Sequence, residues 1–278
     1  MIQEAVINAT TEASGELVLP ASIEGLPVTT IEKKAFLSRK QIKSVQLPPT
    51  IRKIEDWAFA HCDRLEEITF PHREVELGRA VFLGCGRLQA IHIAGETEDT
   101  AVLLAAAVVQ EDAPYLLDLK EAGSEEWLGK WDARMLAILD SDDMEGYSRQ
   151  ILCGEEDYGS TDVGAFVQEK RKRKVRLLFT RLLHPIGLEE AVRNRLEAYL
   201  REHTKGCESE ETWQVMLSEH AEDVVYQTLF AKLGCISEEN FDGLLEETGE
   251  DRPLLRAFLL RYREEHMQNV NFFADLEL

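Results

Sequence analysis

The residues that could carry chemistry in this chain are its cysteines and histidines. Five cysteines stand at scattered positions, and an odd number indicates reduced thiols rather than a disulfide framework. Cys62 and Cys85 are 23 residues apart and could form a disulfide or a metal pair. Because free cysteine is commonly buried, we favour a repeated packing position for both, and equally for Cys207 and Cys235. The sequence has no Cys-x-x-Cys or His-x-x-x-His pair that would support zinc, so we predict no metal site and no cofactor.

The seven histidines do not stand in a recognisable catalytic order with serine, cysteine or carboxylate side chains, although a triad cannot be read from spacing alone. Paired carboxylates are too abundant to mark a site. We therefore predict no catalytic residues and a protein that is not an enzyme. An unrecognised enzyme with its site in the helical half of the chain stays open as an alternative.

A basic run at residues 170–174, followed by Arg176 and Arg181, is the sharpest charge feature. Such a run could contact nucleic acid or an acidic partner. Aromatic residues do not interleave with it, and its surroundings are strongly acidic. We therefore favour an exposed helix face that neutralises neighbouring acidic helices.

The net charge of −21 is concentrated in one part of the chain. Residues 1–95 hold 12 acidic and 11 basic residues, whereas residues 96–278 hold 40 acidic and 20 basic residues. An acidic body repels phosphate backbones and anionic lipid, so we expect neither nucleic acid nor membrane as the main partner. The apolar run at 101–109 is far shorter than the roughly 20 residues that span a bilayer. The start of the sequence lacks a basic segment followed by an apolar run, so we expect no secretion signal.

The elements that must position any site are set by a repeat of 23 residues between residues 17 and 93. Phe36, Phe59 and Phe82 share one register. A fixed period of this length is typical of a solenoid, in which each unit buries its apolar side against its neighbours. Since neighbouring strands lie about 4.8 Å apart, the three phenylalanines should stack as a ladder in the core. The segment 54–62 is too short for a regular helix, and we expect a turn with a second short strand there.

Alternation of apolar and polar residues inside each repeat predicts a strand with one buried and one outward face. The outward positions form a candidate protein-binding surface, which comprises Ser44, Gln46, Glu67, Thr69 and His92, flanked by Val18 and Ala90. About four strands would build this surface. That is small for a standard interface of roughly 800 Å² per partner, so a solvated sheet face is an equally good interpretation. The groove where the sheet meets the helices could enlarge the surface.

The repeat pattern resembles the BspA-type leucine-rich repeat family over about residues 17–95. The resemblance is carried by LP-x-I-x-x-I-x-x-x-AF-x-x-C-x-x-L-x-x-I-x-(L/F)-P, seen best at 47–71, and by the extra segment EGLPV before the first unit. The third unit departs from the pattern: Val81 replaces alanine, HREVEL replaces the usual short turn and Ala94 replaces proline. The resemblance implies a right-handed solenoid and protein recognition. Members of the family are often surface proteins.

After residue 95 the pattern changes to helices. The run at 101–109 is apolar all round, so we expect a buried helix that covers the open end of the solenoid. Trp127 and Trp131, four residues apart on one helix, should lie in the core. Further helices are expected near five ranges: 113–119, 124–139, 144–153, 162–183 and 188–202.

A second repeat, of 28 residues, occupies the end of the chain. GCESEE at 206–211 recurs as GCISEE at 234–239. Glycine suits a left-handed position after a helix, and Ser209 and Ser237 suit the N-cap of the next one. The sequence predicts two tandem helical hairpins, at 206–233 and 234–264. The apolar segment at 270–278 lacks clear caps and could fold back or serve as a contact segment.

Together these patterns predict an α+β multidomain protein. A leucine-rich-repeat module at 1–95, with an N-terminal cap, is followed by an acidic all-helical domain of tandem hairpins at 96–278. The predicted role is non-enzymatic protein–protein interaction or scaffolding, through the concave face of the repeats or through their junction with the helices. We expect a cytoplasmic monomer. A cell-surface, adhesin-like binding protein is the first alternative.

Overall fold

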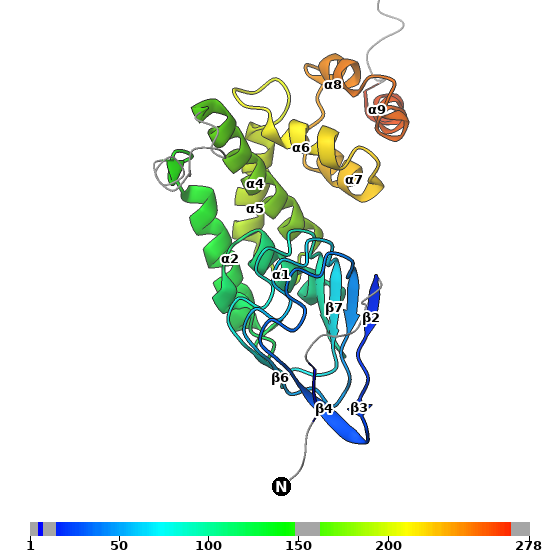
Figure 1. Ribbon diagram of the computed structural model, residues 1–278. Helices are drawn as coiled ribbons and strands as arrows, with labels where there is room; N and C mark the ends of the chain where they lie inside the picture. The colour runs from blue at the N-terminus through cyan, green and yellow to red at the C-terminus, as the bar shows by residue number, and fades with distance from the viewer. Residues whose placement is uncertain (1–4, 8–14, 148–161, 268–278) are drawn as a thin grey trace, which may run out of the picture. The chain divides into compact units, whose positions relative to one another are not determined.

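The computed structural model describes residues 5–7, 15–147 and 162–267 (Figure 1). The chain forms two compact units. Unit 1 comprises residues 1–141 and 180–189, and unit 2 comprises residues 142–179 and 190–278. Helix α4 (Val163–Leu183) contributes to both units. Residue 95, after which the sequence predicts a domain boundary, lies inside unit 1, and the division into domains at 1–95 and 96–278 stays a prediction.

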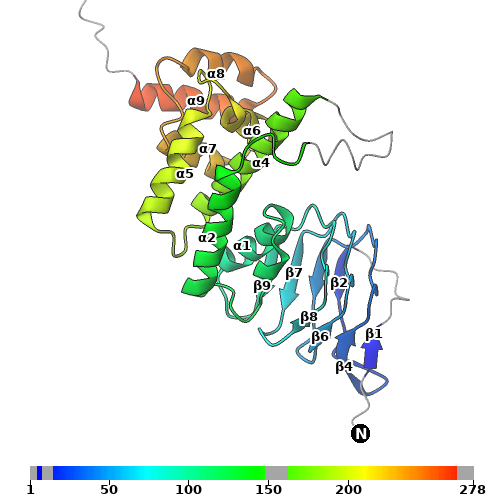
Figure 2. The same cartoon turned by 90° about the vertical axis from the view of Figure 1, so that its left-hand side faces the viewer.

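Two sheets of parallel strands hold the repeats of unit 1 (Figure 2). The first sheet has four parallel strands, which are β2 (Glu16–Val18), β5 (Ser44–Gln46), β7 (Glu67–Phe70) and β9 (Ala90–Ile93). The parallel part of the second sheet is formed by β1 (Ala5–Ile7), β4 (Leu26–Ile31), β6 (Lys53–Ile54) and β8 (Glu76–Leu77). The short β3 (Ser22–Ile23) joins β4 in antiparallel fashion. Successive repeats therefore add one strand to each sheet.

The strand register follows the 23-residue period without a slip from β5 to β9. Ser44 pairs with Glu67, which pairs with Ala90. The second short strand expected around residues 54–62 begins slightly earlier, at Lys53, and turns occupy the rest of the segment. Because the period is constant, equivalent side chains stand next to one another on neighbouring strands.

The phenylalanine ladder predicted from the repeat is present. The ring centroids of Phe36 and Phe59 lie 5.1 Å apart, and those of Phe59 and Phe82 lie 6.0 Å apart, with nearly parallel planes. All three side chains are buried. The ladder supplies the apolar contacts that hold successive repeats together.

The cysteines of the repeats are buried free thiols. The Sγ of Cys62 donates to the carbonyl oxygen of Phe36 at 3.2 Å, and that of Cys85 donates to the carbonyl oxygen of Phe59 at 3.1 Å. Burial raises the pKa of the Cys62 thiol to about 11 and that of the Cys85 thiol to about 12. Both residues thus occupy the repeated core position that the spacing predicts.

Each repeat also places two residues in the left-handed backbone region. The first series has φ angles of 51–62° and comprises Lys34, Trp57 and Ala80. The second series has φ angles of 56–73° and comprises Ser38, His61 and Gly84. A Cβ on Gly84 would come within 2.5 Å of the His61 ring, so glycine leaves room there for the ring of the preceding repeat.

Helix α1 (Glu98–Val109) follows the last strand and packs against β9, as predicted for the apolar run. The Thr97 hydroxyl caps it by accepting the backbone N–H of Thr100. The helix expected at 113–119 is wrong: the structure has only a short 3-10 turn, η1 (Pro114–Leu116). The segment is too short for a regular helix, and its chain turns toward α2.

Helix α2 (Glu125–Asp140) begins after the Ser124 N-cap. Its Trp127 and Trp131 are fully buried, as predicted. Their indole N–H groups donate to the carbonyl oxygens of Leu116 and Leu103. Each tryptophan therefore fills the core of unit 1 and satisfies a buried backbone acceptor.

The remaining helices beside α4 are α5 (Glu190–Glu202), α6 (Glu211–Glu219), α7 (Val224–Lys232), α8 (Phe241–Thr248) and α9 (Pro253–His266). In unit 2, α6 packs against α7, α8 packs against α9, and α7 packs against α9. The helix expected at 144–153 lies largely outside the described residues. Mixed α and β content is thus established for the chain.

The expected N-cap at Ser209 is wrong, and α8 begins later than expected although the Ser237 hydroxyl still accepts the backbone N–H three residues on. Glu210 and Asn240 precede the first residues of α6 and α8 instead of Ser209 and Ser237. Asn240 donates its backbone N–H to the Ser237 hydroxyl and accepts the Ser237 N–H on its own side chain. This reciprocal pair forms a tight turn before the helix, so the helix begins one turn later than the sequence suggests.

Candidate functional site

The outward side chains of β2, β5, β7 and β9 form one surface, called here the sheet face. It has two rows of register-paired residues, which are Glu16, Ser44, Glu67 and Ala90, and Val18, Gln46, Thr69 and His92. The fold thus brings together all five of the residues predicted for binding. The buried Val45 and Ile68 alternate with them and fix the sheet on its core side.

Exposure is uneven across the sheet face. Gln46 and Glu67 are exposed, and Val18 is 59% exposed. Ser44, Thr69 and His92 are half-buried, and Ala90 is buried. The two central strands therefore offer the hydroxyls of Ser44 and Thr69 together with an exposed amide and an exposed carboxylate, whereas the edge strand β2 offers the apolar Val18.

His92 joins the sheet face to the first turn of α1. Its Nε2 lies 3.6 Å from a carboxylate oxygen of Glu67, and its Nδ1 lies 3.5 Å from a carboxylate oxygen of Glu98. Both glutamates are more than half exposed. The junction of the repeats with the helix thus carries two carboxylates on either side of one imidazole, which gives this end of the face an acidic character.

Arg73 fixes the other contact between the repeats and the helical segment of unit 1. Its guanidinium donates to the backbone carbonyl oxygens of Leu119, Lys120 and Ala122 and to the carboxylate of Glu96. Arg73 lies in the HREVEL turn, which departs from the other repeats. The departure therefore has a structural purpose: it attaches the last repeat to the chain that leads into α2.

The basic run of α4 is engaged within unit 2. Lys170 donates to the backbone carbonyl oxygens of Asp142 and Glu145. Arg171 and Lys174 both contact the carboxylate of Asp143, at 2.7 and 2.8 Å. These cations lower the pKa of Asp143 against the opposing effect of burial. The run thus neutralises nearby acidic groups, as expected, but the expectation of an exposed helix face is wrong, because Lys174 and Arg181 are buried.

Arg176 continues this pattern further along α4. It forms ion pairs with Glu219 and Glu169, each at 2.7 Å. The hydrogen bonds with Glu219 raise the pKa of Arg176, and the same contact lowers the pKa of Glu219. A nucleic acid would have to compete with these contacts.

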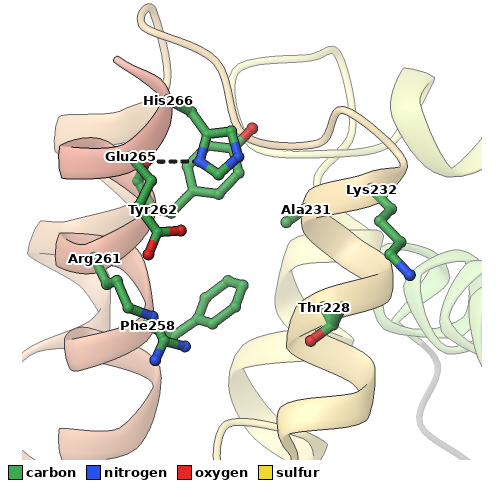
Figure 3. A pocket seen from close by; sticks show the side chains of 8 residues that line it. All are labelled: Thr228, Ala231, Lys232, Phe258, Arg261, Tyr262, Glu265 and His266. Atoms are coloured by element: carbon green, nitrogen blue, oxygen red, sulfur yellow. Dashed lines mark hydrogen bonds between the residues drawn. The ribbon is translucent and has the colours of Figure 1, made fainter. Parts of the chain in front are cut away.

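Sequence reasoning missed an open groove between α7 and α9. The groove has a volume of about 340 Å³ and is lined by Thr228, Ala231, Lys232, Phe258, Arg261, Tyr262, Glu265 and His266 (Figure 3). Apolar residues recur along one side of α9, where Leu255 and Leu259 are buried whereas Phe258 and Tyr262 are half-buried. Periodicity alone marks the stripe and does not show that part of it faces a groove.

Across 5–7, 15–147 and 162–267, histidine, cysteine and carboxylate side chains nowhere gather in a group of three or more that could hold a metal ion. Within the same ranges, the helices all fall short of the length and apolar character needed to cross a membrane.

Comparison with known families identifies the repeats. The model described as BspA type leucine rich repeat region matches residues 19–101, in six copies. Residues 19–101 form a BspA-type leucine-rich repeat region. The match covers less than a third of the chain, and it agrees with the resemblance carried by the 23-residue pattern. Leucine-rich repeat regions generally mediate protein interactions and are typically non-enzymatic.

Among solved structures, the chain is similar to the crystal structure of a leucine rich repeat protein from T. pallidum. The two sequences are 26% identical over 30% of this chain and 53% of that protein, with a TM-score of 0.23. The matched segment thus spans about half of that protein's length. The comparison with curated proteins found no match.

Proposed function

We propose that this chain is a non-enzymatic binding protein, and that its sheet face, extended to the first turn of α1, binds a basic segment of a protein partner. The observation that carries the proposal is the placement of Glu67, His92 and Glu98 next to one another where the sheet face meets the first turn of α1. Glu16 adds a further carboxylate at the edge strand. Lysine or arginine side chains of a partner would meet carboxylates at both ends of the face.

The size of the sheet face limits the kind of partner. Four strands about 4.8 Å apart span roughly 14 Å, which is about half the roughly 28 Å side of a square patch of about 800 Å², the area that each partner buries in a standard interface. The residues at the start of α1 lengthen the surface beyond β9. A short extended segment fits these dimensions better than a large globular surface does.

Electrostatics favour such a partner and set its behaviour. Exposed carboxylates attract a basic segment from a distance and raise its association rate, and salt weakens this attraction. The neutral Ser44, Gln46 and Thr69 would then form hydrogen bonds with the backbone or side chains of the bound segment. We expect affinity to fall as ionic strength rises.

We also propose that the repeats form a right-handed solenoid, that the later helices form tandem hairpins, and that the protein is cytoplasmic. Register-paired parallel strands and the stacked phenylalanines support a right-handed solenoid, and the pairing of α6 with α7 and of α8 with α9 supports tandem hairpins in a helical domain. The free thiols of Cys62 and Cys85, which act as hydrogen-bond donors, support a reducing, cytoplasmic environment. Recovery of the protein on the cell surface after fractionation would overturn the cytoplasmic placement.

The test of binding is a matched charge reversal. Glu67→Arg changes an exposed carboxylate on the sheet face, and Glu76→Arg makes the same change on an exposed strand residue of the other sheet. The tagged full-length chain and both variants are used for affinity capture from the native cell, followed by mass spectrometry. We expect Glu67→Arg to lose partners that Glu76→Arg retains. Equal recovery with both variants would remove the sheet face as the binding surface.

A further inference from the structure

The groove between α7 and α9 has the properties of a binding site for a short polypeptide. Figure 3 shows Phe258 and Tyr262 on α9 facing Ala231 and Thr228 on α7 across the groove. The rings of Phe258, Tyr262 and His266 follow one another along α9, with centroid separations of 6.5 and 4.4 Å. This arrangement gives the groove an aromatic wall for the side chains of an extended segment.

Charged groups border this aromatic wall. Lys232 and Arg261 are exposed, and neither forms an ion pair with any residue in the described part of the chain. This distinguishes them from the basic run of α4, whose side chains contact carboxylates and carbonyl groups. Glu265 is the carboxylate among the lining residues. The groove therefore suits a segment that combines apolar and acidic residues.

Residues 268–278 of the same chain have this chemistry. Phe272, Phe273 and Leu276 supply apolar side chains, and Asp275 and Glu277 supply carboxylates. These residues lie outside the described part of the chain. We propose that they bind in the groove between α7 and α9, with aromatic side chains against Phe258 and Tyr262 and with carboxylates toward Lys232 and Arg261.

Residues 268–278 are long enough to reach along the groove. The groove runs back from His266 to Phe258, which is about 12 Å at 1.5 Å per helical residue. Extended chain covers about 3.3 Å per residue, so roughly four residues span the groove. Residues 267–271 leave length for the chain to reverse its direction after α9. Residues 272–277 then suffice to follow the groove. A segment tethered beside the groove has a high effective concentration, so weak contacts are enough to hold it.

Crosslinking in the full-length chain tests the proposal. The photoreactive residue p-benzoylphenylalanine replaces Tyr262, which keeps an aromatic ring in the groove, and circular dichroism checks the fold. The control carries the same residue in place of Glu264, an exposed position on α9 outside the groove lining. We expect peptides from 268–278 to be crosslinked at position 262 and not at position 264. Crosslinks at position 262 to other parts of the chain, or none, would overturn the proposal.

Mixing isotope-labelled and unlabelled chains in equal amounts separates binding within one chain from binding between two copies. Crosslinked peptides of mixed labelling would show that the occupant is a second copy, which contradicts the proposal.

Charge exchange tests the proposed ion pairs. Two exposed pairs are worth about a fivefold change in occupancy, so Lys232→Glu with Arg261→Glu should lower the crosslink yield by about that factor. Adding Asp275→Lys and Glu277→Lys to this variant should restore the yield. A yield that stays low after the second exchange would contradict the charge pairing, as would a yield that the first exchange leaves unchanged.

Discussion

Arg181 is the residue whose removal should destabilise unit 1 most clearly. Its side chain is fully buried, and its guanidinium contacts both carboxylate oxygens of Asp132, at 2.6 and 3.1 Å. It also donates to the backbone carbonyl oxygens of His184 and Ile186 and lies 5.8 Å from the ring of Trp131. Each nitrogen of the buried guanidinium therefore donates to an acceptor, and a buried charge is tolerated in a core only when it is paired in this way.

Replacing Arg181 with methionine leaves the carboxylate of Asp132 in the core without its cation. Breaking a buried pair by removing one partner costs about 3–5 kcal/mol. Replacing both residues, as Arg181→Met with Asp132→Leu, removes the stranded charge as well. The two carbonyl oxygens then remain without a donor, at about 1–3 kcal/mol each. We therefore predict that the double variant is more stable than Arg181→Met alone.

Hydrogen-exchange mass spectrometry measures the free energy of opening separately in each unit, because peptides from α2 report on unit 1 and peptides from α8 report on unit 2. We expect Arg181→Met to lower the free energy of opening of α2 by several kcal/mol and to have a smaller effect on α8. A loss in α2 of less than about 1 kcal/mol would show that the pair contributes no more than an exposed one. A double variant less stable than Arg181→Met would refute the reasoning about the stranded carboxylate.

Three further predictions follow from contacts elsewhere in the chain. Arg73→Ala should destabilise unit 1 by about 2–4 kcal/mol, since several carbonyl acceptors lose one donor; unchanged urea unfolding of this variant would show that water replaces the guanidinium. Burial lowers the pKa of His220 below its ordinary value of 6.5, so the unfolded chain binds more protons than the folded chain does. Unit 2 should therefore lose stability as pH falls below about 6.5. This loss of stability should be smaller in His220→Phe, and an equal loss in both proteins would contradict the prediction. Iodoacetamide should label the exposed Cys207 in the native protein well before the buried Cys62 and Cys85, and equal rates by mass spectrometry would show that the repeats open readily.

The repeat region was predictable because residues of the same type recur at a constant spacing and pack against one another. Phe36, Phe59 and Phe82 are large apolar residues, and the period places them on neighbouring strands. The same period places Ser44 beside Glu67 and Gln46 beside Thr69, so the sheet face could be predicted residue by residue. Alternation along each strand then decides which side chains point outward.

Features that depend on distant partners were not predictable in this way. Arg73 contacts carbonyl groups 46 to 49 residues away, and no local pattern records such contacts. Trp57 adopts a left-handed φ of 56°, although its side chain does not favour that region; its place in the repeat imposes the conformation. The groove between α7 and α9 requires two helices to be placed together, which the stripe on α9 alone does not determine.

The helix starts at α6 and α8 show a different limit of sequence reasoning. Serine followed by two glutamates is a good N-cap signal, yet the helices begin after Glu210 and Asn240. The Asn240 side chain also donates to the carbonyl oxygens of Lys205 and Cys235. These longer-range hydrogen bonds stabilise a turn at the position where a local rule favours the first turn of the helix.

The central claim is that the sheet face, with its acidic end at Glu67, His92 and Glu98, binds a basic segment of a partner. The most direct measurement is calorimetric titration of the captured partner with the full-length chain, with Glu67→Arg and with the matched Glu76→Arg variant, at low and high salt. We expect Glu67→Arg to weaken binding by tenfold or more, in line with about 1.4 kcal/mol or more for reversing a charge at the interface. We expect Glu76→Arg to leave the affinity unchanged and salt to weaken binding to the unaltered face. Equal affinities of the two variants, with no dependence on salt, would contradict the central claim.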